Sequence, residues 1–207
     1  MQVIGKPAKQ RTEVRQASLI EAALRLAAQR SPSNITTGDL ARAVGITQGA
    51  VFRHFASKAA IWLAVLDWVT ATLMARLQIA AASQPGLAAL RAVFMAHVHF
   101  VMAYPGVPRV IFQELQQPQD TALKARVRAL MQQYRQLLMQ LLLQAQAQQS
   151  MAQDINLQAA AVLFIGSVQG LVMQSLMSDD VAGMAAQAPG VYAIYQRGLL
   201  AAEPALF

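Results

Sequence analysis

The sequence predicts an all-α protein with an N-terminal head of three helices and a C-terminal bundle of about six helices. Apolar residues recur at intervals of three and four through most of the 207 residues, which is the period of an amphipathic helix. No stretch shows the strict apolar and polar alternation of a half-buried strand. Two short helical patterns meet at Gly45, and the rest of the chain is organised around this junction.

The first helix is expected over residues 12–30, where apolar residues recur with helical spacing. The run Ser31-Pro32-Ser33-Asn34 consists of turn-forming residues and ends it. This helix is expected to pack on the next two helices and so to complete the head.

Residues 36–58 carry the pattern of a helix-turn-helix. Ala41 is small enough for two helices to cross closely, and Gly45 can adopt the positive φ that turns the chain after the first helix. Thr36 and Thr47 stand where a side-chain oxygen accepts the unpaired N–H groups of a first helical turn. Two capped helices joined by a tight turn are therefore expected, the second spanning 47–55.

Six further helices are predicted from apolar periodicity and turn signals. Five of them are expected over residues 58–82, which Ser57 caps, and over 87–103, 109–116, 155–177 and 191–202. The remaining helix, between 109–116 and 155–177, begins at Pro118 and Asp120 and ends in the polar run 144–149. The division into domains is expected at residues 1–56 and 57–207.

Positive charge is concentrated in the N-terminal quarter of the chain. Residues 1–58 hold nine Lys or Arg and three acidic residues, a net charge of +6, whereas the remainder holds eight and seven, a net charge of +1. A basic surface of this kind displaces counterions from phosphates. The distribution favours a nucleic-acid partner for the head. The absence of cysteine and of an apolar signal segment near Met1 favours a cytoplasmic protein.

Residues 36–58 resemble the TetR family of transcriptional regulators. The residues that match the family's pattern are Thr37, Leu40, Ala41, Gly45, Ile46, Thr47, Gly49, Val51, His54, Phe55, Ser57, Lys58 and Ile61. Two positions depart from it: Phe52 replaces the usual tyrosine and lacks its hydroxyl, and Ala59 replaces the usual acid after Lys58.

The resemblance implies a homodimer, paired through its last two long helices, that places two copies of helix 47–55 in successive major grooves of a pseudo-palindromic operator. Gln48 is the side chain best able to read a base edge, through a bidentate contact to adenine. The residues expected at the DNA are Thr36, Thr37, Thr47, Gln48, Gly49, Ala50, Phe52, Arg53, His54 and Lys58.

The resemblance also implies an effector pocket among the helices of the C-terminal domain. These helices offer many apolar side chains and few charges, so a small and mostly apolar effector is expected to release a repressor from DNA. Residues expected to line the pocket are Trp68, Phe94, His97, Met102, Phe112, Gln113 and Met139. A DNA-binding protein without an effector is an alternative.

No catalytic or metal-binding arrangement is found in the sequence. His97 and His99 are two residues apart on a predicted helix and therefore point about 200° from each other. A Gly-rich phosphate loop, an H-E-x-x-H motif and a paired-carboxylate constellation are all absent from the sequence. Neither an enzyme nor a cofactor nor a metal site is expected.

Residues 155–178 contain no charged side chain and are long enough to span a bilayer. Four polar residues interrupt them, however, and their longest apolar run is short. A stripe formed by Val162, Gly166, Gly170 and Met173 would let another helix approach closely. This helix is therefore expected to form a subunit interface. The alternative, a membrane-associated helical protein, is less favoured, and no membrane partner is expected.

Overall fold

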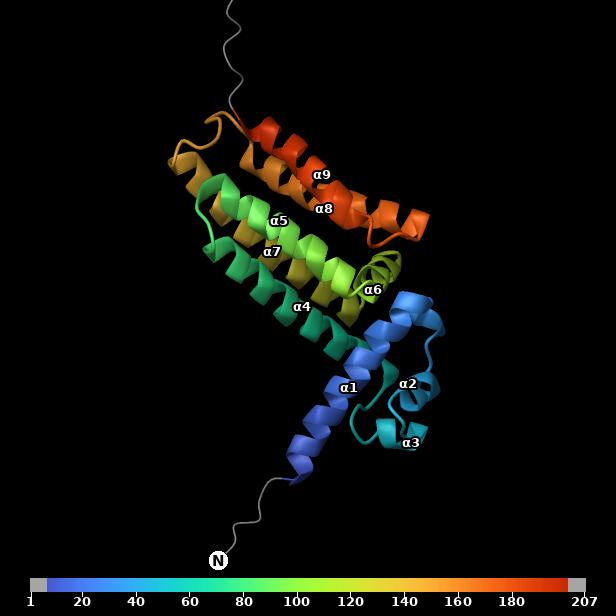
Figure 1. Cartoon of the computed structure of the whole chain (residues 1–207). Helices are drawn as coiled ribbons and strands as arrows, with labels where there is room; N and C mark the ends of the chain where they lie inside the picture. The colour runs from blue at the N-terminus through green and yellow to red at the C-terminus, as the bar shows by residue number, and fades with distance from the viewer. Residues whose placement is uncertain (1–6, 201–207) are drawn as a thin grey trace, which may run out of the picture. The chain divides into compact units, whose positions relative to one another are not determined.

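The computed structural model describes residues 7–200 and the side chains of residues 12–200. Within this part of the chain all regular secondary structure is helical, as the sequence predicted. The elements, labelled in Figure 1, are α1 (Pro7–Gln29), η1 (Pro32–Asn34), α2 (Thr37–Ala43), α3 (Gln48–Val51), α4 (Lys58–Ala82), α5 (Gly86–Ala103), α6 (Gly106–Leu115), α7 (Ala122–Ala147), α8 (Leu157–Ser178) and α9 (Met184–Leu199).

The chain divides into two compact units. The first, here called the head unit, comprises residues 1–70 and 104–128, and the second, the bundle unit, comprises residues 71–103 and 129–207. Helices α4 and α7 therefore each contribute to both units. Helix α6 belongs to the head unit, so the compact unit around the helix-turn-helix contains more than the N-terminal 56 residues.

The head unit is built on the packing of α1 against α2 and α6. Leu19, Ala23 and Ala27 of α1 are fully buried. Gly106 opens α6 directly over α1, and a Cβ at this position would overlap the Leu24 carbonyl oxygen and lie 2.9 Å from the Ala28 nitrogen. The two helices thus approach backbone to backbone at this point.

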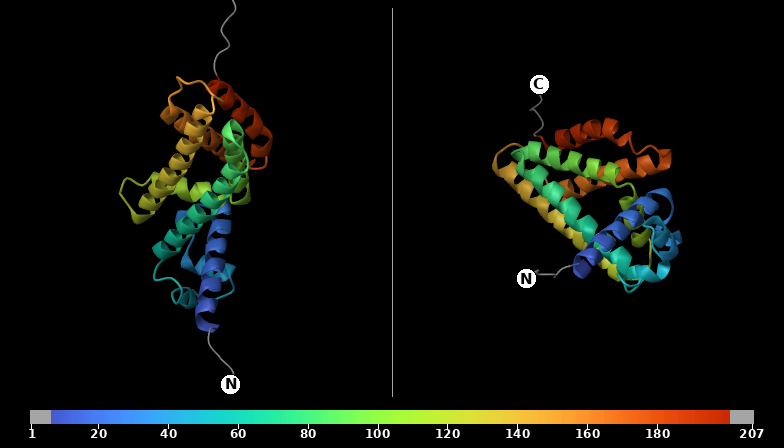
Figure 2. Two further views of the ribbon diagram at one scale, coloured as in Figure 1. Left: turned by 90° about the vertical axis from the view of Figure 1, so that its left-hand side faces the viewer. Right: turned by 60° about the horizontal axis from the view of Figure 1, so that its bottom comes forward.

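The bundle unit is organised around an aromatic cluster where α5 packs on α8 and α9. The ring centroid of Phe94 lies 5.3 Å from that of Phe164 and 5.4 Å from that of Tyr192. The Tyr192 hydroxyl donates a hydrogen bond of 2.8 Å to the Leu87 carbonyl oxygen. Helices α8 and α9 lie side by side (Figures 1 and 2).

Several predicted helix bounds were wrong. Helix α6 begins at Gly106, three residues before the predicted start, because Pro108 lies in the first turn, where a missing N–H costs no helical hydrogen bond. Helix α7 begins at Ala122, since Thr121 caps it by accepting the Lys124 N–H at 3.0 Å.

Helix α9 begins at Met184, seven residues before the predicted start, and contains Pro189. Its side chains Met184, Ala188 and Tyr192 are buried at helical spacing, and this packing offsets the hydrogen bond that proline removes. The structure places the end of α9 at Leu199, and the last two residues of the predicted helix, 201 and 202, lie outside the described residues.

Three helices, α4, α5 and α8, are long and apolar enough to cross a membrane by length and composition alone. On α8 a row of apolar side chains faces outward: Val162 is 56% exposed, Leu163 57% and Met177 74%. Gly166 and Gly170 lie on this same exposed row, and a Cβ on either would meet no atom within 4 Å. Among the described residues of the bundle unit, no side chain covers this apolar row.

Candidate nucleic-acid interface

The first helix of the helix-turn-helix is fixed by a reciprocal cap. The Thr36 hydroxyl oxygen accepts the Asp39 N–H at 3.1 Å, and the Asp39 carboxylate accepts the Thr36 N–H at 2.9 Å. Thr36 also donates its hydroxyl hydrogen to the same carboxylate at 2.8 Å. This is the cap that the sequence predicted at Thr36, and it satisfies two backbone donors at the start of α2.

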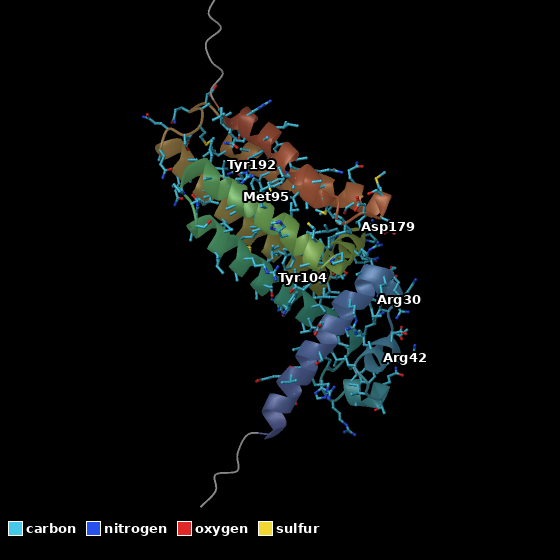
Figure 3. All side chains as sticks on the ribbon, viewed as in Figure 1. Arg30, Arg42, Met95, Tyr104, Asp179 and Tyr192 are labelled. Carbon is cyan, nitrogen blue, oxygen red and sulfur yellow. The ribbon has the colours of Figure 1, made fainter. Side chains whose placement is uncertain are left out.

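Asp39 also joins two arginines to the cap. Its carboxylate lies 3.1 Å from Arg30 at the end of α1 and 3.6 Å from Arg42 on α2; Figure 3 labels both arginines. The hydrogen bonds from Thr36, with Arg30 beside them, lower the pKa of Asp39 to about 2. The carboxylate therefore ties the end of α1 to the start of α2.

The turn and the second helix follow the predicted pattern only in part. Gly45 has a φ of +69°, as predicted, and the Thr47 hydroxyl oxygen accepts the Ala50 N–H at 3.2 Å. Helix α3, however, ends at Val51 and not at Phe55. The Arg53 N–H bonds to the Ala50 carbonyl oxygen, which tightens the chain into a shorter-range turn and stops the α-helix.

The exposed side of α3 presents the residues that the sequence assigned to DNA. Thr47, Gln48, Gly49 and Arg53 are exposed and Ala50 is partly buried. Phe52 is 49% exposed, although it is a large aromatic residue. A Cβ on Gly49 would meet no atom within 4 Å, so the backbone of α3 is directly accessible there.

Gln48 makes a hydrogen bond within the helix-turn-helix. Its side-chain amide nitrogen donates to the Thr37 hydroxyl oxygen at 2.8 Å. Thr37 is buried, with 9% of its surface exposed, so it orients Gln48 rather than facing solvent itself. An amide can donate two hydrogens, and its oxygen is a further acceptor, so Gln48 retains groups for a base edge.

Side chains of α1 bind the carbonyl ends of α2 and α3. Gln16 donates to the His54 carbonyl oxygen at 2.8 Å, and Arg15 and Arg25 reach the Val44 and Ala43 carbonyl oxygens at 3.5 Å. These acceptors have no helical partner at a C-terminus, and cationic donors suit them. The sequence analysis did not single out these three residues, whose only signal is a polar face on a helix predicted to pack on the head.

Two other predicted phosphate contacts lie near the same surface. The Lys58 ammonium donates to the Ser33 carbonyl oxygen at 3.0 Å, which places it at the loop before α2. His54 is partly buried, and its Nδ1 atom has no hydrogen-bond partner among the described residues. Ser57 caps α4 as predicted, because its hydroxyl oxygen accepts the Ala60 N–H at 3.1 Å.

The residues proposed for an effector are divided between the two units. Trp68, Phe112 and Gln113 belong to the head unit, and Phe94, His97, Met102 and Met139 to the bundle unit. The Gln113 side-chain oxygen accepts hydrogen bonds from the Ser31 hydroxyl and the Ser33 N–H, both at 3.0 Å. The Trp68 ring packs edge-on against Tyr104, with centroids 5.0 Å apart.

His97 is partly buried on α5 of the bundle unit. Its Nδ1 atom is 3.1 Å from the hydroxyl oxygen of Tyr134, a fully buried residue of α7. Burial lowers the pKa of His97 to about 4 and raises that of Tyr134. Both side chains are therefore uncharged at neutral pH, and they form a polar pair in an otherwise apolar interior.

Comparison with protein-family descriptions gives two matches. The description "Bacterial regulatory proteins, tetR family" matches residues 19–65, which include the helix-turn-helix. A second, "Tetracyclin repressor-like, C-terminal domain", matches residues 111–188. Together they reach into both compact units.

Curated relatives include the nucleoid occlusion factor SlmA of Vibrio vulnificus, which is 26% identical over 176 residues, 84% of this chain and 88% of that protein. SlmA of Vibrio cholerae is 26% identical over 155 residues, 74% and 79% of the two chains. Both relatives carry the name nucleoid occlusion factor.

Solved structures show the same fold. The regulator FadR from Bacillus subtilis, in complex with stearoyl-CoA, aligns with a TM-score of 0.77 at 16% identity, over 88% of this chain and 98% of that one. NalD, the secondary repressor of a multidrug efflux pump in Pseudomonas aeruginosa, aligns with a TM-score of 0.67 at 22% identity, over 91% and 98%.

Proposed function

The chain belongs to the tetR family of bacterial regulatory proteins, and we propose that this DNA-binding regulator is a homodimeric repressor released from its operator by a small molecule. The observation that carries the proposal is the exposed, polar side of α3, where Gln48, Gly49 and Arg53 face solvent beside a capped α2. Reaching chromosomal DNA requires a cytoplasmic location.

Within this surface, base recognition and phosphate binding fall to different residues. Gln48 stands at the N-terminus of α3, the end of a recognition helix that contacts base edges in the major groove. Gly49 and Ala50 allow close approach, or contact with a thymine methyl group. Arg53, His54, Lys58 and Thr36 would bind phosphates. Thr37, which the sequence had assigned to a phosphate, is buried and would instead hold Gln48 in place.

Two substitutions test this division of roles on operators selected from random DNA. Gln48→Ala should relax preference at one base pair per half-site, by about 1–3 kcal/mol. Lys58→Ala should weaken all DNA alike and lower the salt dependence of binding by roughly one counterion, since an ammonium carries no base information. Equal loss of specificity in both variants would contradict the assigned roles. Arg91→Ala, on an exposed position of the bundle unit, is the matched charge control.

The dimer is proposed to form through the outer faces of α8 and α9. The support is the apolar row on α8 with its two glycines, together with Ile194 of α9, which is 74% exposed. Small residues allow helices to pack at close range, and burial of apolar side chains supplies about 25 cal/mol per Å². A homodimer would also pair two copies of α3 for a pseudo-palindromic site.

Gly170→Leu tests this interface. The added side chain should weaken self-association and DNA binding together, because it fills the space that a second helix needs. Ala129→Leu adds bulk at an exposed position of α7 and is the control. If sedimentation shows that the Gly170→Leu protein remains dimeric, the interface must lie on another surface.

The effector is proposed to be mostly apolar. The bundle unit supports this, because its core is packed with aromatic and aliphatic side chains and its polar pair, His97 and Tyr134, is uncharged at neutral pH. Polar groups of this kind orient a ligand whose affinity comes from apolar burial. Thermal-shift screening of hydrophobic drugs, aromatic acids and phosphorylated metabolites tests it. Release from DNA by a phosphorylated metabolite alone would contradict the proposal.

A second candidate function is suggested by the SlmA relatives, which match this chain across both units. Their name, nucleoid occlusion factor, indicates a role that depends on coverage of the nucleoid. Mapping of bound sites on the chromosome separates the two candidates. A few sites next to promoters favour an operator-bound repressor, and many sites distributed over the chromosome favour the second role.

A further inference from the structure

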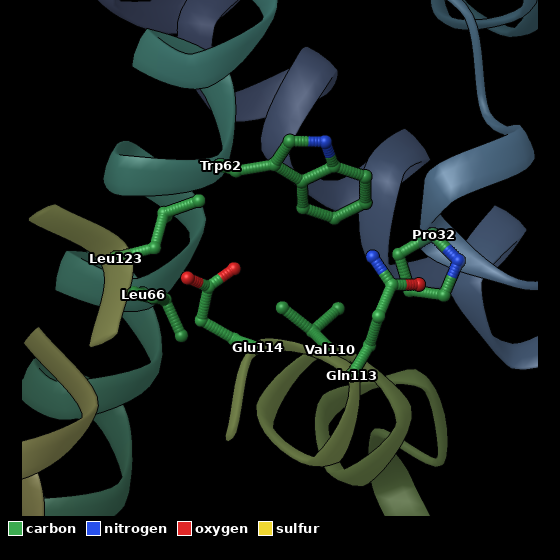
Figure 4. A pocket seen from close by; sticks show the side chains of 7 residues that line it. All are labelled: Pro32, Trp62, Leu66, Val110, Gln113, Glu114 and Leu123. Carbon is green, nitrogen blue, oxygen red and sulfur yellow. The ribbon is translucent and has the colours of Figure 1, made fainter. Parts of the chain in front are cut away.

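The head unit contains a pocket formed by four elements. Its walls come from η1, α4, α6 and α7, and Figure 4 shows the residues that line it: Pro32, Trp62, Leu66, Val110, Gln113, Glu114 and Leu123. Five of the seven are apolar, and Trp62 is almost fully buried. The pocket is thus an apolar site with one acidic and one amide side chain.

Glu114 is the group in this pocket that lacks a counterion. Only 9% of its surface is exposed, and one of its carboxylate oxygens accepts a hydrogen bond from the Thr121 hydroxyl. None of the ion pairs among the described residues includes it. Figure 4 shows its carboxylate directed into the space between Leu66, Leu123 and Trp62.

The surroundings of Glu114 favour a positive ligand. A buried carboxylate is costly unless it is paired, and one hydrogen bond satisfies only part of its accepting capacity. Glu114 also lies in the last turn of α6, where the helix carbonyls add partial negative charge. A cation in the pocket would compensate both charges at once.

The second polar group does not compete for this role. The Gln113 oxygen is already occupied by Ser31 and Ser33, and Figure 4 shows its amide nitrogen, not its oxygen, turned toward the pocket. Glu114 is therefore the acceptor that a ligand meets. A metal ion would require more ligands, and the described residues contain no group of three His, Cys, Asp or Glu side chains able to hold one.

The size of the pocket limits the ligand. The cavity volume is about 40 Å³, and a single water needs about 10–15 Å³ on the same measure. The space therefore admits a group of only a few heavy atoms, while the mouth of the pocket is open to solvent. An ammonium group with a short alkyl chain matches both the acidic group and the apolar walls.

We propose that this pocket binds a small organic ammonium ion, held by the Glu114 carboxylate and packed against Trp62, Leu66 and Val110. The bound ion would lie beside Gln113, whose oxygen holds the loop that leads into α2. Its role as an effector rests on the proposed function, whereas the binding itself does not. The site selects for positive charge, which the mostly apolar effector proposed above does not require.

Titration of the purified chain with n-butylamine at neutral pH tests the site, with n-butanol as the uncharged ligand of the same shape. Binding is followed by tryptophan fluorescence in a Trp68→Phe background, where Trp62 is the single tryptophan, and by calorimetry on the unaltered chain. Saturable binding of the amine, at least tenfold tighter than of the alcohol, is expected.

Glu114→Gln keeps an acceptor for Thr121 and removes the charge. It should weaken amine binding by about 10- to 100-fold, the worth of a hydrogen bond to a charged group, and leave the alcohol unaffected. Asp120→Asn, an exposed acid of the neighbouring loop paired with Arg128, is the control and should change neither. Because Gln conserves the shape of Glu and removes an unpaired buried charge, folding is verified by a cooperative melting curve without ligand whose midpoint is not lowered.

Equal affinity for amine and alcohol, or unchanged amine binding in Glu114→Gln, would overturn the proposal. Operator binding is measured in a separate arm. A chain that binds the amine but no DNA would contradict the proposed function and support the ammonium site. A chain that binds its operator but not the amine would contradict the ammonium site and support the proposed function.

Discussion

The close approach of α6 to α1 gives the sharpest test of how the head unit is built. Gly106→Ala places a methyl group against the Leu24 carbonyl oxygen and the Ala28 nitrogen. Both are backbone atoms of α1, so they cannot rotate aside as a flexible side chain would. Helix α6 must therefore move away from α1, and the contact that joins them must open.

The cost follows from known overpacking penalties. An extra methyl group in a well-packed core costs about 1–3 kcal/mol, and rigid backbone neighbours favour the upper half of that range. A gain of up to about 0.5–1 kcal/mol from replacing glycine in a helix must be subtracted. The expected loss in free energy of unfolding is about 1–2.5 kcal/mol, which lowers Tm by roughly 2–10 °C in a chain of this size.

Urea denaturation followed by circular dichroism measures this loss. Gly190→Ala is the matched control, because its Cβ would meet no atom within 4 Å on α9. The control should be neutral, or more stable by up to about 1 kcal/mol. If Gly106→Ala proves as stable as Gly190→Ala, the backbone contact between α1 and α6 does not exist in solution.

Three further outcomes are expected. Thr36→Ala removes the cap of α2 and should cost about 1 kcal/mol in urea denaturation. Phe94→Ala leaves a cavity beside Phe164 and should cost about 3–5 kcal/mol, whereas Phe52→Ala on the surface should cost under about 0.5 kcal/mol. Because burial lowers the pKa of His97 from 6.5 to about 4, the unfolded chain binds its proton first on acidification. The contribution of His97 to the free energy of unfolding is therefore fully present above about pH 6.5, and it decreases by up to about 3 kcal/mol as the pH falls toward 4. Denaturation curves at several pH values measure this decrease, which should be absent in His97→Gln.

The parts of the head that could be predicted from sequence are those governed by local chemistry. A threonine three residues before a helical N–H, or a glycine between two short helices, has one low-energy arrangement that neighbouring residues alone decide. Thr36, Thr47 and Gly45 were therefore predicted with their roles. The end of α3 could not be, because it depends on a change to shorter hydrogen bonds at Arg53 that leaves the apolar pattern intact.

Long-range packing accounts for the larger errors. The last helix was predicted to begin at residue 191, directly after Pro189 and Gly190, which both disfavour a helix by propensity. In the structure Met184 and Ala188 are buried on the same side as Tyr192, so tertiary contacts extend α9 through the proline. In the sequence this packing is visible only as apolar residues at helical spacing on both sides of Pro189. Without the helices that pack against them, such spacing does not decide whether the helix continues through the proline.

The residues that line the pocket of the head unit were the hardest to predict, and Glu114 shows why. Sequence periodicity marks apolar faces, so it proposed aromatic and methionine side chains such as Phe94, which proves to be fully buried core. From sequence alone, an acidic residue on a short helix is expected to be exposed to solvent. Its importance arises from an absence, namely that no basic side chain of the described residues pairs with it in an apolar pocket. The sequence alone does not show which of the chain's seventeen lysines and arginines lie near Glu114, so the missing ion pair is recognised only in the folded structure. A buried charge without a partner is therefore a functional signal that only a structure with side chains can supply.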